Sequence, residues 1–306
     1  MKKLILSLVA SVFCLMSAGA EEFRLGSFNI RYSNRNDSVA GNGWGQRAPY
    51  VAGLIRFHDF DIIGTQEGKY HQLEDILSMM PGYSYIGIGR DDGIHAGEHS
   101  AIFYKNDKFD VLDHGDFWLS ETPDCPSKGW DAPSHKRICS WGKFRDRKSG
   151  EKILFINLHM DHKGTVARAE SAKLVLQRVK ELSDGLPVII TGDFNADQHS
   201  KPYAILQNSG IVRDSYEIAD FRYAPNGTYF AFEPYRFTLK RIDHLFVNDG
   251  FHVKKYGVLT DTYRAPLTDK QKASGKFMVS EKSPDYTDRT PSDHYPVMIV
   301  VETVKK

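Results

Sequence analysis

Polar side chains that suit catalysis or metal binding recur within or beside the short apolar runs of this chain. Such runs, rich in Ile, Val and Phe, are typical of strands covered on both faces. Burying an ionised or amide group costs several kcal/mol unless the group is paired or binds a metal. We therefore expect these positions to converge at one rim of a sheet, and an active site is the simplest reason for such convergence. The positions are Asn29, Gln66-Glu67, His159, Asp193 with Asn195, Asp243, and Asp293-His294.

The pattern of apolar residues predicts the main helices and strands. Strands are predicted at 23–30, 62–65, 100–104, 153–158, 188–191, 242–247 and 296–301. Helical periodicity is present at 47–57, 71–80 and 165–182. Because each sheet and helix must bury one face against another layer, the alternation predicts an α/β sandwich in one domain. Residues 127–152 predict a hairpin with a basic turn formed by Lys143, Arg145, Arg147 and Lys148.

The first twenty residues differ from the rest of the chain. Lys2 and Lys3 precede an apolar run from Leu4 to Met16, and Ala18-Gly19-Ala20 supplies the small residues that a signal peptidase requires. The run is short for a membrane span, so an uncleaved anchor is the weaker alternative. We expect 1–20 to be a signal peptide and 21–306 a single catalytic domain that is periplasmic or secreted.

The charge of the exported part is close to zero. The full chain has 40 Lys and Arg against 39 Asp and Glu, and loss of Lys2 and Lys3 leaves 38 against 39, a formal net charge of −1. No global positive field therefore attracts nucleic acid or acidic membranes. This argues mildly against a non-specific nucleic-acid binder but leaves a nuclease with a local basic patch open.

Two cysteines, Cys125 and Cys139, lie beyond the expected signal peptide. An oxidising compartment would allow a disulfide between them that closes one short loop. Free thiols are equally compatible with the sequence. Either way the chain is long enough to bury a substantial core without disulfides.

The polar positions lie within a set of short motifs that resembles the endonuclease/exonuclease/phosphatase superfamily. Its members include pancreatic deoxyribonuclease, apurinic-site endonucleases, neutral sphingomyelinases and inositol polyphosphate 5-phosphatases. The resemblance covers almost all of the exported part and implies a four-layer α-β-β-α sandwich, with two packed, mainly antiparallel or mixed sheets flanked by helices. Residues 117–123 further resemble an exported bacterial branch. The motifs are Ser27-Phe28-Asn29-Ile30-Arg31, Thr65-Gln66-Glu67, Asn157-Leu158-His159, Gly192-Asp193-Phe194-Asn195, Arg241-Ile242-Asp243-His244 and Ser292-Asp293-His294-Tyr295-Pro296.

The resemblance also implies a metal site. Glu67 would be the principal Mg²⁺ ligand, with Asn29 beside it, directly or through water. Asp293 would make an additional contact to the metal or to its water. One carboxylate with amide and substrate oxygens suits a hard cation that keeps several waters, and Mn²⁺ could substitute.

The remaining motif residues would carry the reaction. His294 would be the general base or the electrostatic partner of the attacking water, and Asp243 would hold its ring. Asp193 and Asn195 would position the nucleophile and the phosphoryl oxygens, since a spacing of two puts both side chains on the same side of an extended segment. His159 would donate to a non-bridging oxygen. The residue that protonates the leaving group stays unassigned.

Several further residues have two interpretations. Glu98 could orient His159. Arg137 could hold a substrate phosphate or form a salt bridge. His159 and His162 could be half of a zinc site, but no second His/Cys cluster has zinc-like spacing. Trp44 and Arg47 fit a helix-start packing role better than a cleft mouth, and Asn226-Gly227-Thr228 is first a turn. His99, His135, His199 and His252 are interpreted as surface or structural residues.

Together the motifs predict a Mg²⁺-dependent hydrolase of phosphate esters, either a phosphodiesterase or a phosphatase, that works by in-line attack of water. No Ser or Cys lies in a recognisable nucleophile setting, which disfavours acyl transfer. The alternatives are a catalytically inactive module on the same fold that binds a phosphorylated ligand or a partner, and a zinc hydrolase. A small phosphodiester or a nucleic acid is favoured over a bilayer lipid as substrate. We expect a monomer without an obligate protein partner.

Overall fold

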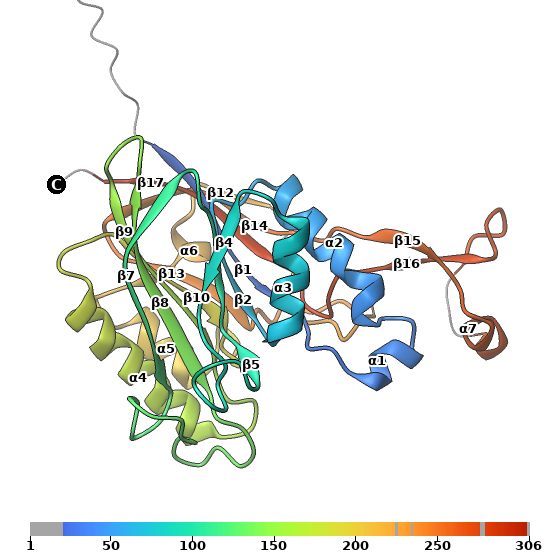
Figure 1. Ribbon diagram of the computed structural model, residues 1–306, viewed down its shortest axis with the longest axis horizontal. Coiled ribbons are helices and arrows are strands. Elements are labelled where there is room, and N and C mark those ends of the chain that lie inside the picture. Colours follow the sequence, from blue (N-terminus) through green and yellow to red (C-terminus); the bar gives the residue numbers. More distant parts are fainter. Residues whose placement is uncertain (1–20, 224–225, 234, 276–278, 305–306) are drawn as a thin grey trace, which may run out of the picture.

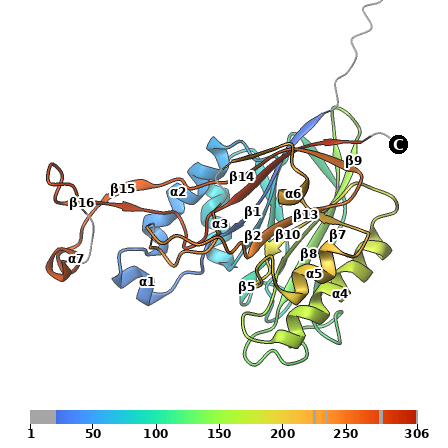
Figure 2. The ribbon, with the colours of Figure 1, turned by 180° about the vertical axis from the view of Figure 1, so that it is seen from behind.

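Two β-sheets pack face to face in this protein, and helices cover both outer faces (Figures 1 and 2). The computed structural model describes residues 21–223, 226–233, 235–275 and 279–304. The expected signal peptide, 1–20, lies outside the described residues. The arrangement confirms the four-layer sandwich that the sequence predicts.

The first and the last strand of the described chain lie next to each other in the middle of the first sheet. β1 (Glu22–Asn29) is parallel to β2 (Ile62–Gln66) and antiparallel to β17 (Val297–Thr303). The carboxyl ends of β1 and β2 therefore lie beside the start of β17. Among the described residues, the strand order is β12 (Phe221–Tyr223), β14 (Phe251–Val258), β17, β1, β2, β6 (Ile102–Lys105) and β4 (Tyr83–Ile86).

The second sheet repeats this arrangement. β9 (Lys152–His159) is parallel to β10 (Val188–Asp193), which is antiparallel to β13 (Asp243–Val247). The ends of β9 and β10 thus lie beside the start of β13. Among the described residues, the order is β11 (Arg213–Asp214), β13, β10, β9, β8 (Ile138–Asp146) and β7 (Phe109–Trp118).

Three apolar layers hold the sandwich together, and alternate residues of a strand supply different layers. On β10, Ile189 packs between the sheets, whereas Val188 and Ile190 pack under α4 (Thr165–Leu182) and α5 (Lys201–Gln207). On the other side, Phe28 and Ile63 pack under α2 (Trp44–Phe57) and α3 (Tyr70–Met79). Both faces of each central strand are therefore buried, as the continuous apolar runs predict.

The helices match their predicted positions within a few residues, but the predicted hairpin at 127–152 is wrong in extent. β8 begins only at Ile138, and the turn to β9 lies at 147–151. Lys143 and Arg145 belong to β8 itself. Residues 127–137 form a loop, where Pro133 and the left-handed backbone of Trp130 (φ 48°) prevent a strand.

Short elements complete the structure. β15 (Tyr263–Pro266), β16 (Tyr286–Arg289) and α7 (Asp269–Ser274) form an arm that projects from the sandwich (Figure 1). The others are α1 (Arg35–Val39), β3 (Gly68–Lys69), β5 (Glu98–His99) and α6 (Ser215–Ile218). Within the described ranges, no helix has the length and apolar character needed to cross a membrane. Cys125 is exposed and Cys139 buried, and both thiols are free, so the disulfide that the sequence left open is absent.

The buried amide of Asn157 on β9 helps to join the two sheets. Its Nδ2 donates to the carbonyls of Thr65 on β2 (2.9 Å) and of Ala101 just before β6 (3.0 Å), both on the side of the first sheet. Its Oδ1 accepts from Gln66 Nε2 (2.6 Å) and Thr191 Oγ1 (3.1 Å). All four hydrogen bonds available to an Asn side chain are thus made. Gly64 is required opposite, since a Cβ there would lie 2.4 Å from Asn157 Oδ1.

We expect Asn157→Ala to lower the free energy of unfolding by about 2–4 kcal/mol, because it leaves buried partners unsatisfied and opens a cavity. Urea unfolding monitored by circular dichroism measures this. The control is Asn106→Ala, which removes an exposed amide with long hydrogen bonds (3.3 and 3.4 Å) and should change stability by less than about 0.5 kcal/mol. Equal stabilities of the two variants would contradict the bridging role.

Candidate active site

A cleft of about 390 Å³ opens where the ends of the central strands of both sheets meet. Eight of the ten residues singled out from the sequence line it: Glu67, Glu98, Arg137, His159, Asp193, Asn195, Asp293 and His294. The other two, Asn29 and Asp243, are buried and bond directly to lining residues. The convergence that the sequence predicts is therefore present.

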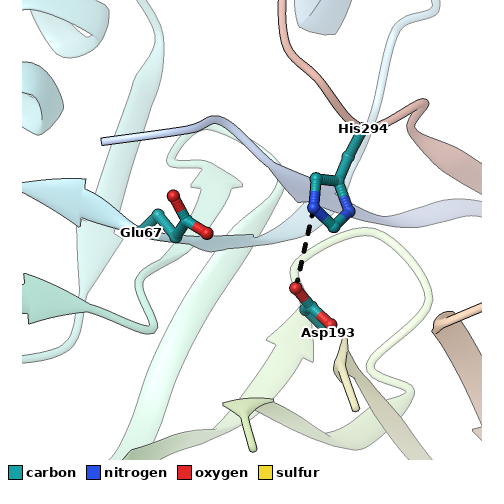
Figure 3. Close-up of side chains that lie close together, drawn as sticks. All are labelled: Glu67, Asp193 and His294. Atoms are coloured by element: carbon teal, nitrogen blue, oxygen red, sulfur yellow. Dashed lines mark ion pairs between the residues drawn. The ribbon is translucent and has the colours of Figure 1, made fainter. Parts of the chain in front are cut away.

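Glu67, Asp193 and His294 form the centre of the cleft (Figure 3). Glu67 follows β2, Asp193 ends β10 and His294 precedes β17, so both sheets contribute. One potential ligand atom from each lies within 4.8 Å of the others, and His294 Nε2 is 3.8 Å from Asp193 Oδ2. Among the described residues, this is the one acidic and histidine cluster with the spacing of a metal site.

Asn29 bridges the two carboxylates of this cluster. Its Nδ2 donates to Glu67 Oε1 and to Asp193 Oδ2, both at 3.0 Å. Its Oδ1 accepts from the backbone N–H of Arg31 (3.0 Å). Asn29 thus lies beside Glu67, as expected, but in this arrangement it orients two carboxylates and does not direct its own oxygen at the cluster.

The backbone is left-handed at three residues of the cleft: Arg31 (φ 57°), Glu67 (φ 65°) and Asn195 (φ 47°). Asn tolerates this region, whereas Glu and Arg adopt it at a cost of about 1 kcal/mol or more. Contacts around Glu67 hold it there, since its Oε2 accepts from the backbone N–H of Tyr32 (3.1 Å). Such strain is common at functional sites.

The buried carboxylates of the cleft have few positively charged partners to offset their negative charge. Asp193 is buried, and burial followed by repulsion from Asp243 raises the pKa of Asp193 to about 7. Burial likewise raises the pKa of Asp293. The closest cation to Asp293 and Glu67 is Arg31, whose Nη1 is 3.7 Å from Asp293 Oδ2 and 4.0 Å from Glu67 Oε2. Crowded carboxylate oxygens are what a hard divalent cation binds, so the residues present fit such an ion.

His294 is held by Asp243, with 2.9 Å between Nδ1 and Oδ2. Burial disfavours the charged imidazole, but attraction to Asp243 and then to Asp193 outweighs it and raises the pKa of His294 to about 10. Asp243 is itself fixed by Thr228, whose Oγ1 accepts from the backbone N–H groups of Ile242 and Asp243. The turn residue Thr228 thus supports the site.

His159 has an environment that differs from its expected role as a donor. Its Nε2 lies 3.1 Å from both Arg137 Nη1 and Asn195 Nδ2, which are donors. Its Nδ1 is 3.9 Å from Glu98 Oε2. Burial and the charge of Arg137 hold the pKa of His159 well below its usual value. The ring is therefore neutral, with Nε2 as acceptor and its proton on Nδ1 toward Glu98.

Some lining residues were not assigned to this cleft by the sequence analysis. Arg90 forms a two-pronged pair with Glu98, at 2.5 and 3.0 Å. His135, interpreted as a surface or structural residue, and His162 are exposed but line the cleft. His162 bonds to Arg137 and does not join a metal cluster. Nothing in the periodicity of the chain marks these residues, because loops bring them to the cleft.

Comparison with known proteins gives a consistent result. Residues 26–294 match the model of the Endonuclease/Exonuclease/phosphatase family. A protein of that family from Bacteroides thetaiotaomicron is 53% identical and covers 94% of this chain and 100% of its own, with a TM-score of 0.86. A mannosyl-6-phosphatase from Bacteroides thetaiotaomicron is 54% identical and covers 92% and 100%, with a TM-score of 0.83.

Curated relatives are more distant. Two uncharacterized proteins of Acanthamoeba polyphaga mimivirus are 29% and 30% identical over 49% and 50% of this chain. The match spans only 26% and 60% of the length of those relatives. They therefore say nothing about activity.

We expect Glu67→Gln to weaken binding of Mg²⁺ or Mn²⁺ about 10-fold or more, because a hard cation loses its central carboxylate. Isothermal titration calorimetry with the metal alone measures the dissociation constant. Glu181→Gln, at an exposed position of α4, is the matched control and should leave it unchanged. Unaltered affinity in Glu67→Gln would remove this residue from the metal site.

Asp243→Asn should lower the pKa of His294 clearly below its value of about 10 in the metal-free protein. The substitution removes the largest attraction that favours the charged ring and leaves burial, which opposes it. A titration of the ring protons by NMR reports this pKa. If the pKa of His294 stays near 10 in this variant, Asp193 and not Asp243 would be the cause of the raised pKa.

Proposed function

The chain belongs to the endonuclease/exonuclease/phosphatase family, and from that premise we propose that it is an exported, Mg²⁺-dependent phosphatase that hydrolyses a phosphomonoester of a saccharide. The reaction class is supported by the cleft, which gathers carboxylates, amides and imidazoles from six strand ends. The substrate class is supported by the 54% identity to a mannosyl-6-phosphatase over the whole of that chain. A structure of D. rerio TDP2 in complex with a single-stranded DNA product shares only the fold, at 15% identity.

Glu67 and Asp293 would hold the cation, and Asn29 would orient Glu67 through its bond to Oε1. The bound cation would offset the charge that develops on the phosphoryl and leaving oxygens. Arg31, near both carboxylates, would limit their mutual repulsion before the cation binds. Mn²⁺ could take the place of Mg²⁺.

The protein's own groups then position the water and the phosphoryl group. Asp193, 3.8 Å from His294 and with a pKa raised to about 7, would accept the proton that the attacking water gives up. His294, whose pKa is raised to about 10, would keep its positive charge beside that water. Asp243 would keep the His294 ring in place. Asn195, whose backbone N–H donates to Asp193 Oδ1 (2.8 Å) and whose Nδ2 lies 3.1 Å from His159 Nε2, would hold these two side chains toward the phosphoryl group. Water forms the new P–O bond as the bond to the sugar oxygen breaks.

Location and assembly are also part of the proposal. The positive start, apolar run and small residues of 1–20 support export to the periplasm or beyond. We propose a monomer without an obligate protein partner. A module that only binds a phosphorylated ligand is disfavoured, because every expected catalytic residue lies in or against the cleft.

Protein comprising residues 21–306 should release inorganic phosphate from mannose 6-phosphate in the presence of Mg²⁺, lose this activity in EDTA and regain it with added Mg²⁺. Asp193→Ala and His294→Ala should lower kcat about 10³-fold or more, since the first removes the proton acceptor and the second the charged group beside it. His199→Ala, at an exposed position outside the cleft, is the control.

Two outcomes would contradict different parts of the proposal. Activity that survives excess EDTA, or that persists in both variants, would refute the metal-dependent mechanism. Cleavage of bis-p-nitrophenyl phosphate or DNA without release of phosphate from sugar phosphates would refute the monoester substrate but leave a phosphodiesterase.

A further inference from the structure

Arg137, just before β8, lies between two histidines that line the cleft. Its Nη1 is 3.1 Å from His159 Nε2 and its Nη2 is 3.0 Å from His162 Nδ1. Its Nε is 3.5 Å from Asp161 Oδ2. A guanidinium group only donates, so each facing imidazole nitrogen must accept. Arg137 therefore fixes the tautomer of both rings.

His162 becomes a donor of fixed geometry. Because its Nδ1 accepts from Arg137, the proton of the neutral ring lies on Nε2. Burial and the charge of Arg137 lower the pKa of His162, so the ring is neutral at neutral pH. His162 is exposed and lines the cleft, where its Nε2–H is available to a ligand.

The positive charge of Arg137 is also available to a ligand in the cleft. Arg137 is 5% exposed, and described residues take three of its five N–H groups. Both Nη atoms face neutral imidazoles, and Asp161 also accepts from the backbone N–H groups of Lys163 and Gly164. Another arginine that lines the cleft, Arg90, is paired with Glu98 through two bonds. Arg137 is thus the less compensated of the two cations.

We propose that Arg137 and His162 recognise the two terminal oxygens of a phosphomonoester dianion that face away from the carboxylate cluster, and so select monoesters over diesters. This inference rests on the proposed function and names the residues that set its substrate class. In a diester, a second organic group is attached to one of those oxygens. The diester therefore carries less negative charge than the monoester dianion, and the esterified oxygen is a poorer hydrogen-bond acceptor. A buried donor that loses its acceptor costs binding energy, and such sites discriminate strongly between substrates.

The test compares one monoester with one diester of the same leaving group, p-nitrophenyl phosphate and bis-p-nitrophenyl phosphate, with Mg²⁺ present. His162→Leu should lower kcat/KM for the monoester by about 10- to 100-fold and change that for the diester less than about 3-fold. His162→Gln keeps an N–H near the position of Nε2 and should restore most of the loss. Arg137→Gln should lower kcat/KM for the monoester by about 100-fold or more.

His135→Leu is the matched control. Its ring lies on the same rim, with its centroid 6.1 Å from that of His162, and it makes no hydrogen bond to Arg137. The monoester-to-diester ratio should not change in this variant. Equal losses for both substrates in His162→Leu, or no recovery in His162→Gln, would overturn the proposal, because either result assigns His162 a structural role.

A binding measurement keeps the proposal testable without turnover. In calorimetry with Mg²⁺ at pH 8, inorganic phosphate, a dianion, should bind the unmodified protein about 10-fold or more tightly than dimethyl phosphate, and His162→Leu should abolish this preference. Equal affinities in the unmodified protein would overturn the proposal. Failure to hydrolyse any ester while this preference persists would instead overturn the proposed function alone.

Discussion

The active-site rim depends on the buried amide of Asn157, which fixes one sheet to the other. Apolar layers tolerate small relative shifts of two sheets, whereas the three hydrogen bonds that this amide makes across the interface do not. Glu67 comes from the first sheet and His159 and Asp193 from the second. Asn29 then joins Glu67 to Asp193 at 3.0 Å on each side. The spacing of candidate ligands is thus set by polar contacts between the sheets.

The cleft separates charge between its two sides. One side holds Glu67, Asp193 and Asp293, where burial raises the pKa of the two aspartates. The other side holds Arg137, with its Nη atoms against neutral imidazoles. A cation on the acidic side and an anion on the other would each remove an unfavourable burial of charge. A metal phosphate complex meets both requirements at once, which links the two sides to a single substrate.

The sequence predicts the fold and the acidic side well and the basic side poorly, for physical reasons. Asn29, Glu67, Asp193 and His294 lie at ends of apolar strands, so strand pairing within each sheet and the packing of the two sheets bring them together. Arg90 and His162 lie in loops, whose paths depend on tertiary contacts that periodicity does not encode. The protonation of His159 could not be foreseen either, because it follows from two donors that lie 22 and 36 residues away in the chain.

Two buried arginines show how the same group serves structure in one place and binding in another. Arg47 is fully buried, and four of its N–H contacts go to the carbonyls of residues 30, 31, 42 and 291. It thereby ties the segment after Asn29 to the segment before Asp293, and burial lowers its pKa to about 10. Its donors are consumed by the backbone, so its role is structural. Arg137 has fewer protein acceptors, two of them imidazoles that line the cleft, and its unused donors are therefore free for a ligand.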